Sequence, residues 1–413
     1  MHIAVIGGGA AGFAAAIAAA QAGARVTVLE RNAKPLKKLG VTGNGRGNLM
    51  NTGKPVYFGD SAFAEAVLGR LNVKELTAFF TSLGVPLREE GEALLYPASL
   101  QAASVQQAFL LRAGQLSIDI RCLARVMRIT PQPGGFAVSG MQGSGPDSKR
   151  MTEEPFLLHA DKVIVACGGA AYPVHGTDGT AYGLLTELGH RLTPVFPALC
   201  ALTVAKKELQ GLKGQRVRAR LWLEDSAGHT VRQSDGEALF ADDAVSGIVA
   251  MQLARFVEAG MTLCLDLRGE LNLPGDSLPF VKSLADARSS LPAAELFTGA
   301  FSTPVSRLIL RQAGVKDLSA PIASLGAGML RALAQTIACV RMPVLGTRGF
   351  DAAQVTAGGI ETGDFNPATM ESRLVPGLYA AGEMLNVDGD CGGFNLMFAF
   401  ASGLLAGAAA GEA

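Results

Sequence analysis

One stretch near the start of the chain constrains the fold more than any other. An unbroken apolar run at residues 2–6 predicts a strand buried on both faces, and an alanine-rich run at residues 10–21 predicts a helix. Three glycines with the spacing G-x-G-x-x-G lie at the junction, namely Gly7, Gly9 and Gly12. This order predicts a strand–turn–helix unit whose turn brings the backbone close to a phosphate group.

Each residue of the turn has a separate physical role. Gly7 permits the tight turn, Gly9 lets the backbone approach a pyrophosphate, and Gly12 lets helix and strand pack closely. Ala10 and Ala11 begin the helix, so their amide groups face the same anion. The turn therefore predicts a dinucleotide-binding site.

An acidic residue follows at the place where such a site needs one. A second apolar strand at residues 25–29 precedes Glu30, whose carboxylate can accept hydrogen bonds from the hydroxyls of an adenosine ribose. Because strand, turn, helix and acidic residue follow in order, the pattern is specific, although it does not separate NAD from FAD. The alternative is an alanine- and glycine-rich helix that serves packing alone.

Two later segments have a similar character. Residues 163–166 form another predicted buried strand, closed by the glycines at 168–169, and residues 378–381 form a short strand closed by Gly382 and Glu383. Strands that end in this way approach FAD in flavoproteins, the glycine pair through its backbone and the acidic residue toward the ribityl or pyrophosphate region. For the first of these strands, a simple exit into a loop is an equal alternative.

Taken in this order, the three segments resemble the flavoproteins that have two dinucleotide-binding domains. Other segments narrow the resemblance to a bacterial family described as aminoacetone-oxidase-like or NAD(P)/FAD-dependent oxidoreductases, some of whose members are bile-acid dehydro-steroid reductases. The resemblance extends over nearly the whole chain. The segments that carry it are GVTGNGRGNLMN at 40–51, and those at 172–190, 236–255, 354–360 and 382–396.

The resemblance implies an α/β fold with a Rossmann-like FAD domain. Because the FAD motifs occur at both ends of the chain, that domain must be discontinuous, and we assign residues 1–191 and 344–413 to it. Alternating segments predict a β-rich insert at 192–270, and short helices broken by proline and glycine predict a small helical insert at 271–343.

The motifs and the resemblance together define an expected site for non-covalently bound FAD. Lys38, Arg46 and Asn48 are candidates for contacts to phosphate or to the flavin ring, with solvation at the surface as the alternative. By resemblance, the backbone at Val126 contacts adenine. The full set of expected cofactor-binding residues is Gly7, Gly9, Ala10, Ala11, Gly12, Glu30, Arg31, Lys38, Thr42, Gly43, Gly45, Arg46, Asn48, Val126, Cys167, Gly168, Gly169, Gly382, Glu383, Asp388, Gly392, Gly393, Phe394 and Asn395.

The helix that starts at Phe394 is expected to stabilise the reduced flavin. Its N-terminus carries a partial positive charge, and Gly392 and Gly393 let its amide groups approach the anionic flavin N1. The side chain of Asn395 could add a contact. An ordinary buried helix with a glycine start is the alternative.

Candidate catalytic groups are few, and the catalytic acid or base stays unknown. Tyr172 and His175 could face substrate, although a structural role is more common for such residues in a loop. The helix dipole could lower the thiol pKa of Cys391, but a small buried residue is the simpler interpretation. Asp388, Asp390 and Cys391 mix hard and soft ligands, so no metal is expected.

This chain departs from the family pattern at three places. Gly47 stands where the family usually has cysteine, and Cys167 stands where threonine is usual. The segment at 93–99 lacks the arginine that usually precedes F-P-x-S. The missing cysteine argues against a mechanism that needs a thiol at position 47, and the differences together indicate a divergent subgroup.

Composition limits the partners. The 413 residues carry no formal net charge, so no nucleic-acid partner is expected. None of the six cysteines forms a C-x-x-C pair, which favours a reducing cytoplasm over a disulfide scaffold or structural zinc. The apolar run at 394–410 is a little short for a bilayer span, so no membrane is expected. Nothing in the sequence indicates an oligomeric state.

The function expected from these observations is an FAD-dependent oxidoreductase that acts on a small organic substrate. The chain has no second G-x-G-x-x-G between a strand and a helix, so any NAD(P)H would bind transiently as the reductant. An amine oxidase that releases peroxide is one alternative. A flavin-dependent RNA-modifying protein and a non-catalytic FAD-binding protein are others.

Overall fold

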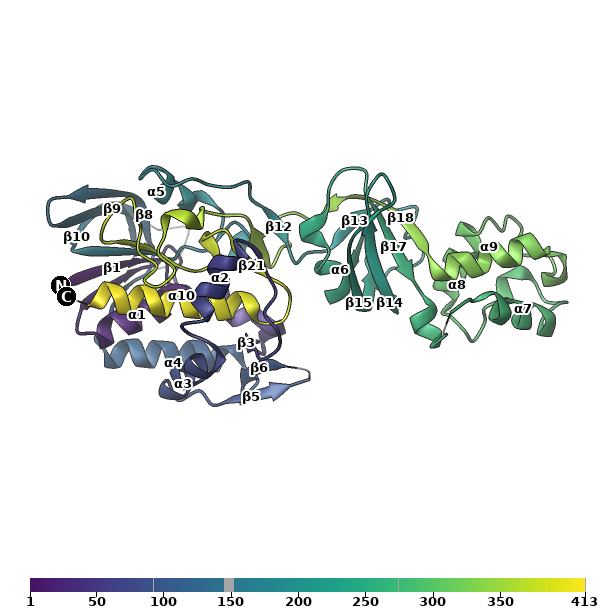
Figure 1. Cartoon of the computed structure of the whole chain (residues 1–413), viewed down its shortest axis with the longest axis horizontal. Coiled ribbons are helices and arrows are strands. Elements are labelled where there is room, and N and C mark those ends of the chain that lie inside the picture. The colour runs from purple at the N-terminus through teal and green to yellow at the C-terminus, as the bar shows by residue number, and fades with distance from the viewer. Residues whose placement is uncertain (92, 145–151, 274, 413) are drawn as a thin grey trace. The chain divides into compact units, whose positions relative to one another are not determined.

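The computed structural model describes residues 1–91, 93–144, 152–273 and 275–412. They form two compact units (Figure 1), which are described separately below. One unit combines residues 1–197 with 354–413, and we call it the nucleotide unit; the other, residues 198–353, is the inserted unit. The three-part division expected from the sequence remains a prediction.

A five-stranded parallel sheet forms the centre of the nucleotide unit (Figure 1). Its order is β20-β11-β1-β2-β7. The apolar run of β1 lies at its middle and is buried along its whole length, as both-face burial requires. The strands are β1 (His2–Ile6), β2 (Arg25–Leu29), β7 (Asp119–Arg121), β11 (Lys162–Val165) and β20 (Leu378–Ala380).

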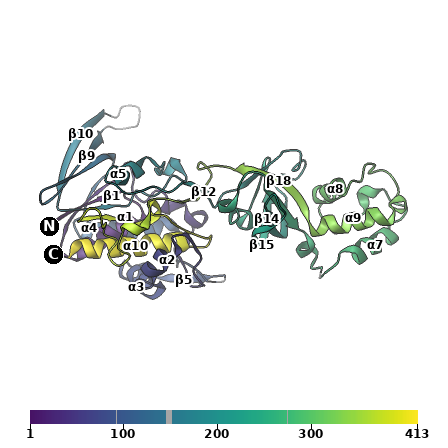
Figure 2. The same cartoon turned by 45° about the horizontal axis from the view of Figure 1, so that its top comes forward.

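Two helices from opposite ends of the chain, α1 (Ala10–Gln21) and α10 (Phe394–Gly411), lie side by side over this sheet (Figures 1 and 2). Small residues allow this close contact. A Cβ atom added to Gly403 would lie 2.3 Å from the Ala11 carbonyl oxygen, and one added to Gly407 would lie 2.1 Å from that of Ala15. By length and apolarity α10 could cross a membrane, but 67% of it is buried inside the protein.

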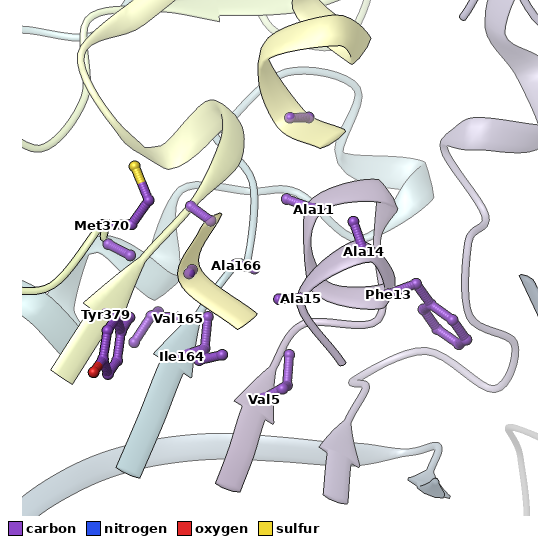
Figure 3. Close-up of a cluster of buried hydrophobic side chains, with 14 of the residues drawn as sticks. Val5, Ala11, Phe13, Ala14, Ala15, Ile164, Val165, Ala166, Met370 and Tyr379 are labelled. Atoms are coloured by element: carbon purple, nitrogen blue, oxygen red, sulfur yellow. The ribbon is translucent and has the colours of Figure 1, made fainter. Parts of the chain in front are cut away.

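The core of the nucleotide unit lies between the sheet and these helices (Figure 3). Val5, Ile164 and Val165 come from the strands, and Phe13 from α1 extends the core away from the sheet.

Antiparallel strands and further helices complete the nucleotide unit. They are β3 (Met50–Asn51), β4 (Tyr57–Gly59), β5 (Leu87–Glu90), β6 (Leu94–Pro97), β8 (Ala124–Gln132), β9 (Gly135–Ser144), β10 (Thr152–Ala160), β12 (Phe196–Ala198), β19 (Val355–Ala357), β21 (Val387–Gly389), α2 (Ser61–Leu68), α3 (Val73–Ser82), α4 (Ala102–Gln115) and α5 (Gly183–Thr186).

The inserted unit contains a closed barrel with the strand order β13-β16-β15-β14-β17-β18. In β14, exposed arginines alternate with buried Val217, Ala219, Leu221 and Leu223, the period expected of a strand with one face inside a barrel. The barrel strands are β13 (Leu202–Val204), β14 (Arg216–Glu224), β15 (Thr230–Phe240), β16 (Ala244–Ser246), β17 (Thr262–Asp266) and β18 (Val340–Thr347).

A helical segment lies between the last two barrel strands in the sequence. Its helices are α7 (Leu278–Ala287), α8 (Thr303–Gln312) and α9 (Ala327–Ala338), while the short α6 (Ile248–Met251) belongs to the barrel part of the chain. Strand β18, which closes the barrel, therefore follows the helices. The predicted α/β class, with a Rossmann-like parallel sheet and an inserted β-rich region, is confirmed.

Candidate functional site

The parallel sheet brings the sequence motifs together at one edge. Carboxyl ends of parallel strands meet at the same edge, and ligands of open α/β sheets bind there. Gly7 follows β1, Glu30 follows β2, Gly168 follows β11 and Gly382 follows β20. The order of the sheet makes these four positions neighbours, although they are up to several hundred residues apart in the chain.

The glycine turn has the geometry of a phosphate cradle. A Cβ on Gly12 would lie 1.9 Å from the Gly7 carbonyl oxygen, and one on Gly7 would lie 2.4 Å from that of Ala166, so close packing requires both glycines. Gly9 differs, because a Cβ there would meet no atom within 4 Å. Gly9 is also the N-cap of α1 and supplies no side-chain cap. The first turn of α1 thus faces open space, which fits a pyrophosphate.

Glu30 is buried and held by backbone and side-chain donors. The Gly8 amide donates to its Oε2 at 2.8 Å, and the Asn32 amide and Nδ2 both donate to its Oε1 at 2.7 Å. The Ala124 amide donates to the Glu30 carbonyl at 2.9 Å, which fixes the start of β8 and therefore Val126 beside this edge. No local pattern in the sequence indicates this role of Asn32, which orients the carboxylate.

Glu383 lies at the end of β20 in a second polar cluster. Lys38 Nζ is 2.7 Å from its Oε2, and the Thr356 amide donates to its Oε1 at 2.9 Å. The Thr356 hydroxyl oxygen in turn accepts hydrogen bonds from the amides of Ala170 at 2.7 Å and Ala171 at 2.9 Å. Thr356 thereby fixes the turn after β11. Its segment at 354–360 contributed to the family resemblance, but no pattern indicated this role.

A buried hydroxyl without a partner lies near this cluster. Tyr182 is 4% exposed, and its Oη atom has no hydrogen-bond partner within the described part of the chain. Burial, together with the charge of Glu383, raises the pKa of Tyr182, so the hydroxyl keeps its proton at neutral pH. An orphaned donor in this place fits a polar ligand that supplies the missing acceptor.

The loop at residues 39–48 folds back on itself and joins the start of α10. Gly43 has φ +56, where a Cβ would lie 2.8 Å from the Asn48 amide nitrogen. In the amide orientation that satisfies both atoms, the Asn48 side-chain oxygen accepts from the Gly393 amide at 3.2 Å, and its nitrogen donates to the Met50 carbonyl at 3.1 Å. Gly45 instead faces open space. Asn48 therefore ties this loop to the helix.

Other side chains of the same loop are used within the protein. The Thr42 hydroxyl donates to the Leu39 carbonyl at 2.7 Å. Arg46 pairs with Glu90 at 2.6 Å and lies over the Tyr96 ring at 4.8 Å from its centroid. Gly47 has φ +78, and its Cβ would lie 3.2 Å from Ala102 Cα. The family cysteine would be strained at position 47 in this backbone.

The Asn395 side chain makes hydrogen bonds within the segment that leads into α10. Its Oδ1 accepts from the Gly389 amide at 2.8 Å and its Nδ2 donates to the Gly389 carbonyl at 2.7 Å, so the amide closes its own loop. Gly392 and Gly393 have φ +120 and +98, and a Cβ on Gly393 would lie 2.6 Å from the Met50 carbonyl oxygen. Asp388 is buried on β21, and Tyr57 donates to the Phe394 carbonyl at 2.8 Å. A contact from the Asn395 side chain to flavin stays an untested prediction.

The segment that follows β11 contacts the residues that follow β2. Arg31 pairs with Asp178 at 2.8 Å, and Asn32 Nδ2 donates to the His175 carbonyl at 3.3 Å. Tyr172 adopts φ +63, and its ring centroid lies 4.5 Å from that of His175. Burial, followed by the charges of Lys37 and Lys38, lowers the pKa of His175, whose Nδ1 has no partner in the described residues. Neutral His175 could accept a proton or donate one.

The two cysteines of the site are protonated thiols. Burial, followed by the charge of Asp390, raises the pKa of Cys391 to about 11. This direction is opposite to the one that the helix dipole would give, so the idea of a lowered pKa at Cys391 was wrong. Burial likewise raises the pKa of Cys167 to about 12, and its sulfur lies 3.4 Å from the Ile6 carbonyl oxygen. Neither cysteine has the thiolate character of a nucleophile at neutral pH.

A serine–histidine–aspartate arrangement elsewhere in the nucleotide unit has the wrong geometry for catalysis. Ser372 Oγ lies 3.1 Å from His190 Nε2, but His190 Nδ1 is 3.7 Å from Asp364 Oδ2, longer than a hydrogen bond. The side chain of His190 is fully buried, and Ser372 is only 5% exposed. This cluster is structural. The described residues also contain no group of three or more potential metal ligands.

The sheet, the glycine turn, buried Glu30 and half-buried Glu383 define an FAD-binding Rossmann fold of the flavin oxidoreductase class. Residues 1–409 match the family described as the HI0933-like protein Rossmann domain, and the chain belongs to this family. The expected family resemblance is thus confirmed.

Two curated relatives match along almost their whole length. The chain is 35% identical over 427 residues to 3-dehydro-bile acid delta(4,6)-reductase of Clostridium scindens, covering 100% of this chain and 99% of the relative. It is 26% identical over 407 residues to ribosomal RNA dihydrouridine synthase of Escherichia coli. That match covers 96% of this chain and 95% of the relative. Among solved structures, 3-ketosteroid-delta4-(5alpha)-dehydrogenase from Rhodococcus jostii RHA1 has a TM-score of 0.51 at 16% identity, over 100% of this chain and 96% of that one. That likeness concerns the fold alone.

Proposed function

We propose that this protein is an FAD-dependent reductase that saturates a carbon–carbon double bond conjugated to a carbonyl group in a small organic substrate. The observation that carries the proposal is the meeting of four strand ends at one sheet edge, with Gly9 facing open space between the carboxylates of Glu30 and Glu383. Both curated relatives have names that describe addition of hydrogen across such a bond, in a bile acid and in uridine.

The residues of this chain hold and orient the cofactor, which when bound supplies the two-electron transfer. The amides of the first turn of α1 face the pyrophosphate, and Glu30, already fixed by Asn32, accepts from the ribose hydroxyls. Lys38 and Glu383 provide a charge pair at the same edge. Tyr182 offers its unpaired hydroxyl as a donor to the bound cofactor.

The reductant in this proposal is NAD(P)H that binds transiently. Anaerobic titration of the FAD-loaded protein with NADH and NADPH, followed by visible absorbance, tests this step: rapid bleaching is expected. Addition of a conjugated 3-oxo bile acid should then restore the oxidised spectrum. Bleaching by a small amine, without bleaching by either nicotinamide, would overturn the proposal in favour of an amine oxidase.

A variant pair tests the cofactor site directly. Gly9→Ala places a Cβ in the open space of the turn without touching the protein, so the chain should fold while FAD affinity falls at least about tenfold. Gly183→Ala, where a Cβ also meets nothing within 4 Å, is the matched control and should bind FAD normally. Equal FAD affinity of both variants in equilibrium dialysis would place the cofactor elsewhere.

Reduction of uridine in RNA is a second candidate, favoured by the match to the E. coli relative over 96% of this chain. The expectation that nucleic acid is not a partner therefore stays a prediction. RNA binding needs local positive charge, because the chain as a whole has none in excess. Reoxidation of the reduced flavin by uridine-containing RNA, but not by the conjugated bile acid, would support this candidate over the first.

A further inference from the structure

A pair of cysteines in the inserted unit plays no part in the site described above. Cys264 lies on β17 and is fully buried, whereas Cys339 caps the C-terminus of α9 and is partly exposed. Both are free thiols. Cys264 pairs with Arg341 across β17 and β18, and Cys339 stands two residues before Arg341, so both thiols lie beside the same arginine. Two neighbouring thiols, one buried and one partly exposed, suit oxidation chemistry better than packing alone.

Charged and aromatic neighbours surround the pair. On the outer face of the barrel, Cys264 is in register with Trp222 on one side and with Arg341 on the other. Arg341 Nη1 lies 3.9 Å from Cys339 Sγ, and its Nη2 pairs with Glu224 Oε2 at 2.6 Å. Glu224 also accepts from Trp222 Nε1 at 2.7 Å. The guanidinium is thus held beside the Cys339 sulfur.

The two thiols differ in acidity because of this arrangement. The hydrogen bond from Cys264, and then the charge of Arg341, lower the pKa of Cys339. The same hydrogen bond and burial raise the pKa of Cys264. Cys339 is therefore the more acidic thiol of the pair, and the Arg341 guanidinium lies 3.9 Å from its sulfur. By contrast, burial raises the pKa of Cys122, Cys167 and Cys391 in the nucleotide unit.

We propose that Cys339 is a site of oxidation by hydroperoxides and that Cys264 is its resolving thiol. The Cys339 sulfur attacks one peroxide oxygen, the O–O bond breaks, and a sulfenic acid forms while the peroxide is reduced and leaves as water or alcohol. The Cys264 sulfur then attacks the sulfenic sulfur and loses its proton. The S–O bond breaks, water leaves, and a disulfide joins β17 to the end of α9.

Formation of this bond requires a movement of the chain near Cys339. The two sulfurs must come to about 2.05 Å from each other. Cys339 follows the last residue of α9 and precedes β18, with φ −157 and ψ 85, so the movement falls on backbone outside both elements. The bond would close the loop that contains α7, α8 and α9, and so restrain that segment when the unit unfolds.

The test uses the FAD-loaded full-length protein. Treatment with hydrogen peroxide, alkylation of the remaining thiols and peptide mass spectrometry should show a Cys264–Cys339 disulfide that dithiothreitol reverses. Trp222 is the one tryptophan of the chain and lies across from Cys264, so its fluorescence should change with the same peroxide dependence. Oxidation without this linked peptide would overturn the proposal.

Variants separate the two roles. In Cys264→Ser, the sulfenic acid at Cys339 should persist and react with dimedone, while Cys339→Ser should lose both dimedone labelling and the fluorescence change. In the unmodified protein, iodoacetamide at pH 7 should label Cys339 more than about tenfold faster than Cys122. This comparison within one protein decides the matter if a variant fails to fold. Equal labelling rates would refute a reactive Cys339.

Discussion

Glycine serves different purposes in the two units. In the nucleotide unit, Cβ atoms added to Gly12, Gly403 and Gly407 would lie 1.9, 2.3 and 2.1 Å from backbone oxygens, so the close approach of backbones requires glycine. In the inserted unit, Gly247 makes such a contact, at 2.3 Å. Many of its other glycines would meet nothing within 4 Å, including Gly211, Gly228, Gly260, Gly314 and Gly328. Backbone contact shapes the first unit, whereas turns and side-chain alternation shape the second.

Two glycine-to-alanine substitutions, one in each unit, should show this difference in the role of glycine most clearly. Gly407→Ala forces a methyl group against the Ala15 carbonyl and should separate α10 from α1, lowering the free energy of unfolding of the nucleotide unit by about 3 kcal/mol or more. Gly328→Ala, on the exposed first turn of α9, should instead stabilise the inserted unit by up to about 0.5 kcal/mol.

Each unit offers its own spectroscopic probe for these measurements. Trp222 on β14 reports unfolding of the inserted unit, and release of flavin fluorescence reports the nucleotide unit if FAD binds as proposed. Urea titrations followed by both probes should show that Gly407→Ala shifts the flavin transition alone. A variant with unchanged midpoints would show that α10 can move aside at little cost, and that the glycines are not required.

A second pair of substitutions concerns buried hydroxyls. Thr356→Val keeps the shape but leaves the amides of Ala170 and Ala171 without an acceptor, so we expect a loss of about 2–4 kcal/mol in the nucleotide unit. Thr336→Val in α9 removes only a donation to the Ala332 carbonyl at 2.9 Å, and should cost less than about 1 kcal/mol. Urea midpoints measure both. Equal losses would mean that Thr356 does not organise the turn after β11.

The sequence predicted those parts of the site that rest on backbone geometry. The spacing of Gly7, Gly9, Gly12 and Glu30 between strands and a helix predicted their positions at the sheet edge, where the structure has them, and their contact with a cofactor stays a prediction. Thr356 was missed because its hydrogen bonds join segments far apart in the chain, and no local pattern records such a contact.

The inserted unit was harder to predict in detail. Alternation in β14 identified strands correctly, but the closure of the barrel by β18, after three helices, depends on long-range pairing with β13 and β17. A similar limit applied to Cys391. Its position before a helix suggested a lowered pKa, and burial, which depends on the folded chain, reverses the direction.

Acid should destabilise the nucleotide unit through His190. Burial lowers the pKa of this histidine, with the charge of Asp364 opposing the shift. The unfolded chain therefore binds a proton at a higher pH than the folded chain, so stability present above about pH 6.5 is lost as the pH falls. We expect His190→Gln to flatten the pH dependence of unfolding by up to about 1.4 kcal/mol per pH unit.

His229→Gln provides the control for this titration, because His229 is exposed on a turn of the inserted unit. The side chain of His229 is 80% exposed, so this variant reports the effect of removing a histidine that is not buried. If His190→Gln shows the same slope as His229→Gln, buried His190 does not carry the acid sensitivity.

The smallest effect on turnover is expected from a substitution of Cys391, a thiol of the nucleotide unit. With a pKa of about 11, Cys391 is a protonated thiol that serves packing near the start of α10, so Cys391→Ser should keep its flavin content and change turnover less than about twofold. Iodoacetamide at pH 7 should modify Cys391 slowly and Cys339 rapidly in the same sample. If Cys391→Ser lost turnover while it kept its full flavin content, a thiol would act beside the cofactor. Reactive thiol chemistry would then belong to the nucleotide unit as well. Retained turnover, together with selective labelling at Cys339, would separate the flavin chemistry of one unit from the thiol chemistry of the other.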